Sequence, residues 1–163
     1  MVLSSKQQKL QKQMLSPFKF GLFKIMKIPL AYLAGIKLNE LTPYSAQTSV
    51  KYKYLNTNPF KSMYFAVLAM AAELSTGALA LFSIAKYDES IAFLVVESKG
   101  KFHKTATGKI RFICEDGEAF QKELHKCVSE KKPVTVTSKT KGYNSLDQLV
   151  CEYEFTWSFR IRV

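Results

Sequence analysis

The sequence is poor in the residues that build disulfide frameworks and metal sites. It has three cysteines, Cys114, Cys127 and Cys151, with no closely spaced pair, and two histidines, His103 and His125. An odd number of cysteines without paired spacing fits neither a disulfide scaffold nor a zinc site. We therefore expect reduced, structural thiols and no bound metal ion.

Acidic residues are almost missing from the N-terminal third. Residues 1–53 contain nine lysines and one acid, Glu40, so they supply +8 of the net charge of +11. Such an excess indicates an anionic partner, whether nucleic acid, an acidic membrane surface or a small molecule with phosphates. Nucleic acid is the poorest of the three and is not expected, because only three of the 24 basic residues are arginine and most aromatic residues follow core patterning.

Signals of disorder, of several domains and of secretion are absent as well. The composition, 47% hydrophobic and 23% charged with 7 Gly and 5 Pro, excludes a disordered or collagen-like chain. With 163 residues, no internal repeat and no Pro/Ser/Gly-rich linker, the sequence predicts a single domain over 1–163. The polar, lysine-rich start lacks a signal-peptide pattern, so we expect a cytoplasmic protein.

Residues 1–34 form a basic segment that we expect to be helical. Within 16–34, apolar side chains recur at helical spacing on one face and lysines lie on the other, namely Phe18, Leu22, Ile25 and Met26 against Lys19, Lys24 and Lys27. Such a segment can lie on a membrane surface. The commoner arrangement packs the apolar stripe on the domain and leaves the lysines in water.

The longest apolar stretch covers 58–85 and predicts one long helix. Asn58 and Pro59 suit an N-cap and a first helical position, and the only charge between Met63 and Ala85 is Glu73. Its Leu, Ile, Phe and Val side chains favour membrane insertion by about 2–5 kcal/mol, whereas a central acid costs about 2.5–3.5 kcal/mol. Because this balance is marginal, the buried axis of a soluble domain explains the stretch equally well.

The second half of the chain predicts the strands that would cover this helix. Strand patterns occupy 50–54, 91–96, 109–114, 134–137 and 149–163, and a short helix occupies 117–130. An alternating segment as long as the last one belongs to a curved antiparallel sheet. The fold class is therefore α+β, with a curved antiparallel sheet wrapped around a central helix.

Glu73 is the residue best suited to chemistry. Its neighbours at helical spacing are mostly small, and a carboxylate buried without a nearby base has the raised pKa that acid/base catalysts use. The alternative, a buried acid satisfied by backbone donors or by a lysine from elsewhere, is equally open. No GxSxG, GxGxxG or HExxH motif occurs, and residues 105–109 lack the upstream glycine of a P-loop.

The segment Asn58–Gly77, NPFKSMYFAVLAMAAELSTG, resembles the central-helix signature of hotdog-fold acyl-CoA thioesterases. It is most similar to a thioesterase-like branch with an asparagine-rich start and a Met/Ile–Tyr/Phe pair at the beginning of the helix. The basic N-terminal helix and the strand around Phe155–Phe159 look similar too. The resemblance implies a hotdog fold, a homodimer or dimer of dimers with sites at the interface, and an acyl-CoA substrate that itself brings the coenzyme A.

The resemblance also assigns roles to residues at the start of this helix. In the phenylacetyl-CoA type of thioesterase, a His-Gly-Gly segment precedes an acid nine residues after the histidine. Tyr64 holds the histidine position here, Phe65 and Ala66 the two glycine positions, and Glu73 that of the acid. Glu73 is then implied as general base or nucleophile, with the Phe65 amide polarising the thioester carbonyl. Asn58 would orient the carbonyl or water.

Five consecutive residues are expected to line the substrate site: Ser62, Met63, Tyr64, Phe65 and Ala66. A side chain at position 65 crowds an approach that glycine leaves open. This departure favours the alternative, a non-catalytic hotdog protein that binds acyl-CoA, lipid or a protein partner. In that case Glu73 is a satisfied buried acid.

Overall fold

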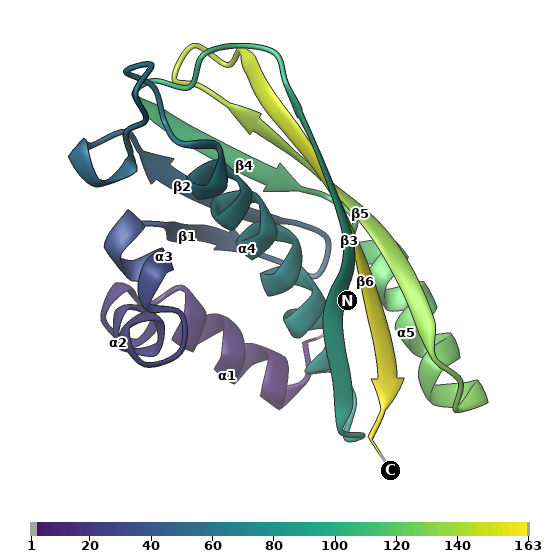
Figure 1. Cartoon of the computed structure of the whole chain (residues 1–163). Coiled ribbons are helices and arrows are strands. Elements are labelled where there is room, and N and C mark those ends of the chain that lie inside the picture. Colours follow the sequence, from purple (N-terminus) through teal and green to yellow (C-terminus); the bar gives the residue numbers. More distant parts are fainter. Residues whose placement is uncertain (1–2, 163) are drawn as a thin grey trace.

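One curved antiparallel sheet forms the frame of the molecule, shown in Figure 1 for the computed structural model, which describes residues 3–162. Its six strands lie in the order β1-β2-β4-β5-β6-β3. Their bounds are Lys37–Leu41 (β1), Ala46–Lys51 (β2), Ile91–Phe102 (β3), Lys109–Cys114 (β4), Val134–Tyr143 (β5) and Leu149–Ile161 (β6). Strands β1 and β3 are the two edges, so the free side of the long β3 strand is open to solvent in the monomer.

The long helix α4, Phe65–Ile84, lies across the concave face of this sheet (Figure 1). Alternate residues of β6 point toward it, and the aromatic members of that row are buried: Tyr153, Phe155, Trp157 and Phe159. Two buried hydroxyl groups tie α4 to the sheet, because Thr48 Oγ1 donates to Ala71 O at 2.6 Å and Ser75 Oγ donates to Thr140 Oγ1 at 2.8 Å. This arrangement is the hotdog fold.

Helix α4 is also long and apolar enough to cross a membrane, judged by length and composition alone, and no other helix within residues 3–162 is. Just over half of its most apolar window, 56%, is buried inside the protein. Such a helix is equally well the core helix of a soluble domain. The contacts of α4 with the sheet are those of a core helix.

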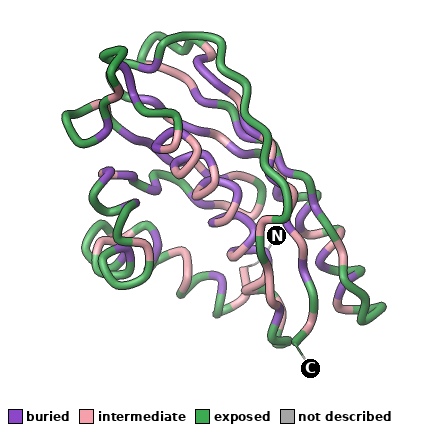
Figure 2. Tube along the Cα trace, in the orientation of Figure 1, coloured by how far each residue is buried: buried purple, intermediate pink, exposed green. Residues whose placement is uncertain are grey.

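Four further helices and one short turn complete the described part of the chain, residues 3–162. Helices α1 (Ser5–Met14), α2 (Pro17–Lys27) and α3 (Pro29–Ala34) lie beside α4, and α5 (Gly117–Glu130) packs on β5, β6 and α4. A single 3-10 turn, η1, covers Tyr54–Asn56. Ser4 and Ser16 accept backbone hydrogen bonds at the starts of α1 and α2, which fixes where these helices begin. Figure 2 shows that much of α2 and α3 is exposed.

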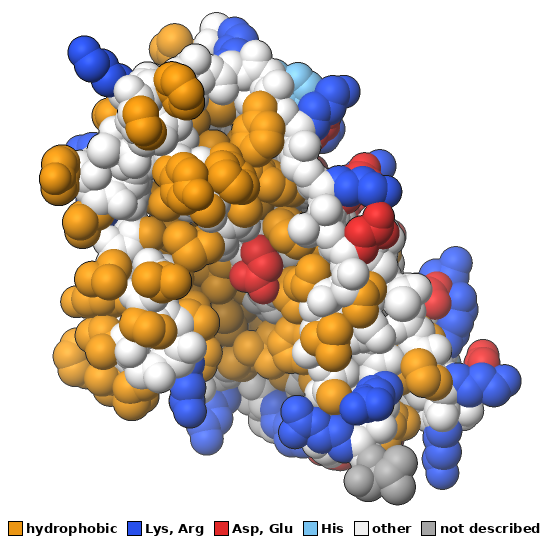
Figure 3. Space-filling view, viewed as in Figure 1, with side chains coloured by type: hydrophobic (Ala, Val, Ile, Leu, Met, Phe, Trp, Pro, Cys, Tyr) orange, Lys and Arg blue, Asp and Glu red, His pale blue; other side chains and the backbone are white. Residues whose placement is uncertain are grey.

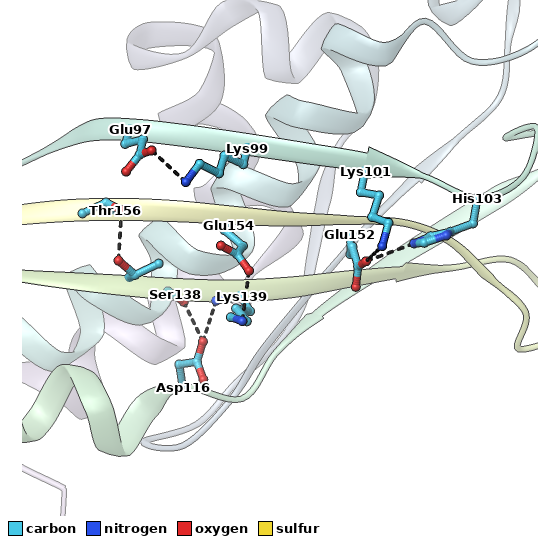
Figure 4. A network of polar contacts seen from close by, with 11 residues as sticks. Glu97, Lys99, Lys101, His103, Asp116, Ser138, Lys139, Glu152, Glu154 and Thr156 are labelled. Carbon is cyan, nitrogen blue, oxygen red and sulfur yellow. Dashed lines mark hydrogen bonds and ion pairs between the residues drawn. The ribbon is translucent and has the colours of Figure 1, made fainter.

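The convex face of the sheet is polar and carries exposed ion pairs, one along β3 and one between β5 and β6 (Figure 4). Lys99 Nζ lies 3.0 Å from Glu97 Oε1, and Lys139 Nζ lies 3.0 Å from Glu154 Oε1. Exposed pairs of this kind are screened by water and salt and contribute little to stability. Because this face is solvated, any apolar substrate site must lie on the face that carries α4.

The predicted strands and helices agree best with the structure where the sequence pattern is local. The predicted bounds of β4 and α5 are confirmed, and the long alternating strand is confirmed as β6. Strand β2 ends at Lys51, so the strand predicted for 50–54 is largely wrong, and β3 continues beyond residue 96 to Phe102. Strand β1 was not predicted.

The central helix begins at Phe65 rather than at Asn58. The Asn58 side chain does cap a backbone turn, but the turn is its own, since Oδ1 accepts from Phe60 N at 2.9 Å and from Ser62 N at 3.2 Å. Lys61 has a left-handed φ of 57°, and an isolated bridge joins Thr57 to Met63. Residues 58–63 are therefore a closed loop that precedes the helix.

Helix α2 exposes its apolar stripe and buries one of its lysines, the reverse of the common arrangement of a surface helix. The interpretation in which its apolar stripe packs on the domain is wrong, because Phe18 is 81% exposed while Lys24 is only 8% exposed. Lys24 Nζ donates to Ile36 O at 2.6 Å and lies over the ring of Phe20 at 5.2 Å. Burial, together with the nearby charge of Lys37, lowers the pKa of Lys24.

Candidate functional site

Glu73 lies at the middle of α4 in an apolar groove. The groove has a volume of about 320 Å³ and is lined by the start of α3, at residues 28–31, and by Met70, Glu73 and Leu74 of α4. Figure 3 shows an acidic side chain surrounded by hydrophobic ones on this face. Because α3 forms the opposite wall, the N-terminal helices contribute directly to the surroundings of the carboxylate.

The Glu73 carboxylate has no hydrogen-bond or ion-pair partner within residues 3–162. Its backbone carbonyl accepts from Thr76 Oγ1 at 3.0 Å, but no donor reaches the side-chain oxygens. Burial raises the pKa of the Glu73 carboxyl, and no compensating charge or hydrogen bond opposes this effect. The alternative in which a lysine or backbone donors satisfy this acid therefore finds no support in the contacts within the monomer. An unpaired, partly buried carboxylate can accept a proton from water.

Gly77 leaves room beside this carboxylate. A β-carbon at position 77 would lie 3.1 Å from the ring of Trp157 and 3.3 Å from Glu73 Oε1. The Trp157 ring is held in place because its Nε1 donates to Thr76 Oγ1 at 3.1 Å. One wall of the Glu73 environment is thus a fixed aromatic ring from β6, which has no sequence proximity to the helix.

We expect the raised pKa of Glu73 to appear in the pH dependence of stability. The folded protein holds this proton to a higher pH than the unfolded chain, in which the pKa has its ordinary value near 4.5. Ionisation therefore costs stability as the pH rises from 4.5 through the folded-state pKa, and no cost is present below 4.5. Urea midpoints measured against pH should show Glu73→Gln gaining on the parent over this range. A constant difference between the two proteins would contradict the assignment.

A second groove lies at the start of α4. It has a volume of about 320 Å³ and gathers the predicted residues Asn58, Ser62, Met63, Tyr64 and Phe65. Ala66 does not line it. The groove also contains residues that were not predicted: Pro59, Phe60, Leu68, Phe102, Lys104, Thr105 and Ala106. The end of β3 and the loop after it bring the last four to this place, and no local pattern in the sequence signals that approach.

The N-terminus of α4 opens into this second groove without a side-chain cap. Within the described residues, no acceptor is present for the amides of Phe65 and Ala66, the first two of the helix. Free amides and the helix dipole make such a helix start favourable for a carbonyl oxygen that gains negative charge. Asn58 lies beside it, but its side-chain oxygen is engaged by the amides of its own loop.

The two grooves do not meet within one protomer. Tyr64 and Glu73 are nine positions apart on a straight helix, which corresponds to about 13 Å along its axis. A small thioester group cannot contact both ends of this distance at once. The monomer therefore holds two separate half-sites, an acid in one and free amides in the other.

The three cysteines and His103 are the remaining nucleophile and acid/base candidates, and their surroundings do not suit catalysis. Cys114, Cys127 and Cys151 are buried and free, which confirms the expectation of unpaired structural thiols. Burial raises the pKa of Cys114 to about 11 and that of Cys151 to about 12, so neither is a ready nucleophile. His103 Nε2 lies 3.1 Å from Glu152 Oε1 on the convex face (Figure 4), away from both grooves.

No family model matches the sequence, and no curated protein matches it. Solved structures do match. A Pseudomonas aeruginosa protein, described as of unknown function and a probable thioesterase, has a TM-score of 0.74 at 19% identity, with 92% of this chain and 99% of that one covered. A thioesterase from Haemophilus influenzae has a TM-score of 0.66 at 11% identity, covering 93% of this chain and 95% of that one.

A mutant thioesterase from Pseudomonas aeruginosa gives a TM-score of 0.67 at 12% identity, with 94% of this chain and 99% of that one covered. These TM-scores establish a shared fold, and at identities this low they establish the fold alone. The chain is a hotdog-fold protein, and its fold is the one that these thioesterases have. The fold that the sequence resemblance implied is therefore confirmed.

Proposed function

We propose that the protein is an acyl-CoA hydrolase that acts at the interface of a homodimer, with Glu73 as general base or nucleophile. The observation that carries this proposal is the unpaired carboxylate of Glu73, partly buried in an apolar groove of a hotdog helix. Burying an unpaired acid costs stability, so its presence in such a place indicates a functional role. The names of the structural neighbours support the same class of reaction.

A second copy of the chain would unite the two half-sites. The open side of β3 offers twelve residues for edge-to-edge pairing, and Leu94 and Val96 on this strand are more than half exposed, at 57% and 54%. If the two copies run antiparallel, the start of one α4 faces the middle of the other. Glu73 of one subunit then lies opposite the Phe65 amide of its partner, which removes the separation of about 13 Å found within one subunit.

The reaction follows from this arrangement. The Phe65 amide donates to the thioester carbonyl oxygen and stabilises the charge that develops on it. As general base, Glu73 takes a proton from water while the water oxygen attacks the carbonyl carbon. The carbon–sulfur bond then breaks, and the departing thiolate receives the proton from Glu73. The products are the free acid and coenzyme A.

The phosphates of coenzyme A would find lysines near the mouth of the second groove. Lys104 lines the groove and is exposed, and Lys61 lies in the loop just before the helix. Lysine is a common phosphate partner. We therefore place the nucleotide end of the substrate outside this groove and the thioester at the helix start.

Thiol release tests the proposed activity. We expect the purified protein to liberate free coenzyme A from at least one member of a panel of short, long and aromatic acyl-CoAs, followed with a thiol reagent. Tight acyl-CoA binding without turnover would instead support the non-catalytic alternative, which the side chain of Phe65 in place of a glycine favours. If the protein neither binds nor hydrolyses any member of the panel, both the catalytic proposal and the non-catalytic alternative are contradicted.

A further inference from the structure

The apolar stripe of α2 is largely exposed. Phe18, Leu22, Ile25 and Met26 are 81%, 50%, 49% and 63% exposed. With 100° of rotation per residue, these positions centre on the side of the helix opposite Phe20 and Lys24, which are buried. A helix that only covers a core has the reverse arrangement. The outward stripe therefore needs an explanation outside the monomer.

The buried Lys24 holds the helix in this orientation. Its ammonium group donates to Ile36 O at 2.6 Å and lies over two aromatic rings, 5.2 Å from the centre of Phe20 and 5.8 Å from that of Tyr32. The adjoining positions Lys19 and Lys27 remain exposed. Turning the stripe inward would move Lys24 into solvent and break these contacts. The contacts of Lys24 therefore fix the orientation of α2 and keep its apolar stripe exposed.

Helix α3 extends the same apolar surface. It follows α2 after one residue, packs on it, and exposes Leu30 and Leu33 at 66% and 55%. Together, six side chains make up what we call the α2–α3 surface: Phe18, Leu22, Ile25, Met26, Leu30 and Leu33. Figure 3 shows hydrophobic side chains gathered on the part of the molecule that carries these helices. Exposed apolar clusters of this kind mark interaction sites.

The charges around the α2–α3 surface select the partner. Lys19, Lys27, Lys37 and Lys53 are exposed on this part of the chain, and no acid precedes Glu40. A second copy of the chain would set lysines against lysines in a protein of net charge +11, so self-association through this surface is disfavoured. The partner must be anionic at its surface and apolar beneath it.

We propose that the α2–α3 surface binds an anionic lipid bilayer. The six apolar side chains enter the boundary between headgroups and acyl chains, while Lys19 at the margin of the stripe contacts lipid phosphates. Lys27, on the opposite side of α2, adds to the attraction at longer range. Phe18, Leu22 and Met26 of this surface also line a groove of about 330 Å³, which they form with α1 and with Leu81 of α4 and which is mainly apolar. Binding in this orientation places that groove at the level of the lipid.

Vesicle sedimentation tests the surface directly. We expect the full chain to sediment with vesicles of equal parts phosphatidylcholine and phosphatidylglycerol, and to stay in solution with phosphatidylcholine alone. Added salt should weaken binding, because it screens the lysines. The double variant Leu22→Ser/Met26→Ser should lose about tenfold or more in affinity. The double variant Lys19→Gln/Lys27→Gln should also weaken binding to the anionic vesicles.

Two matched controls separate the surface from general effects. Leu146→Ser removes a leucine that is 77% exposed in the β5–β6 turn, and Lys122→Gln removes an exposed lysine of α5. Both should bind as the parent does. The urea midpoint of each variant checks folding, and none should fall, since every altered side chain is exposed. The proposal is overturned by absence of binding, by equal binding to phosphatidylcholine alone, or by equal loss in the controls. It is also overturned if Leu22→Ser/Met26→Ser abolishes a dimer without changing sedimentation.

Discussion

Glu73→Gln should lower the rate of acyl-CoA hydrolysis by about 10²–10⁴-fold, the range by which general bases accelerate reactions. Glutamine has nearly the same shape and keeps the groove filled, but it cannot take a proton from water. The Michaelis constant should change far less, because the groove is otherwise apolar. Steady-state thiol release on the best substrate measures both values.

A matched carboxylate serves as the control for this experiment. Glu154→Gln removes an acid of the convex face on the inner strand β6, which pairs with Lys139 at 3.0 Å and is remote from the α4 grooves. Its activity should match that of the parent. If Glu73→Gln hydrolyses the substrate as fast as Glu154→Gln does, Glu73 is neither base nor nucleophile. A retained dimer and a urea midpoint no lower than that of the parent show that a loss of rate is chemical.

Gly117→Ala should destabilise the protein by about 2–4 kcal/mol, which is at the upper end for one added methyl group. Gly117 begins α5 and lies against the turn between β1 and β2, where its amide donates to Tyr44 O at 3.0 Å. A β-carbon here would overlap the Pro43 carbonyl oxygen and Tyr44 Cα. Backbone atoms cannot rotate away as side chains do, so α5 or the turn must shift. Urea unfolding measures the loss.

Replacing a glycine of α2 by alanine should change the free energy of unfolding in the opposite direction. No atom lies within 4 Å of a β-carbon placed at Gly21, so Gly21→Ala should stabilise by about 0.5–1 kcal/mol through helix propensity. Comparing the two variants separates steric overlap from the general effect of replacing glycine in a helix. A neutral Gly117→Ala would mean that α5 is not docked on the β1–β2 turn.

Elements with a strong local pattern could be predicted from the sequence. Strand β6 alternates along its whole length because one of its faces covers α4 and the other meets water. Helix α5 was predicted with its bounds, since its apolar residues recur at helical spacing and Pro133 follows. The α+β class followed from these elements together with the apolar helix.

Other features depend on contacts between distant residues. Asn58 suits a helix cap and a turn equally well, and the bridge from Thr57 to Met63 decides for the turn. The orientation of α2 depends on Ile36 O accepting from Lys24, a contact that no periodicity reveals. The alternation at 50–54 likewise ends early, because η1 begins at Tyr54.

The candidate site could be predicted in part. Glu73 was identified because a lone acid in an apolar helix is conspicuous in any sequence. Its neighbours Trp157 and Pro29 come from β6 and α3, and Lys104 reaches the helix start from the loop after β3. Such groupings follow from the fold and have no local signature. The meeting of Glu73 with the Phe65 amide is a property of two chains and stays a prediction.

The inverted helix α2 reverses the usual rule of mutational tolerance. In most surface helices a lysine is freely replaced and a leucine is constrained. In α2 the replacements that damage the fold should concentrate at Lys24, whose ammonium group donates to Ile36 O and lies over the rings of Phe20 and Tyr32. Leu22 and Met26 should accept polar residues without loss of folding. If leucine or methionine persists there among close relatives, selection acts on a task outside the fold.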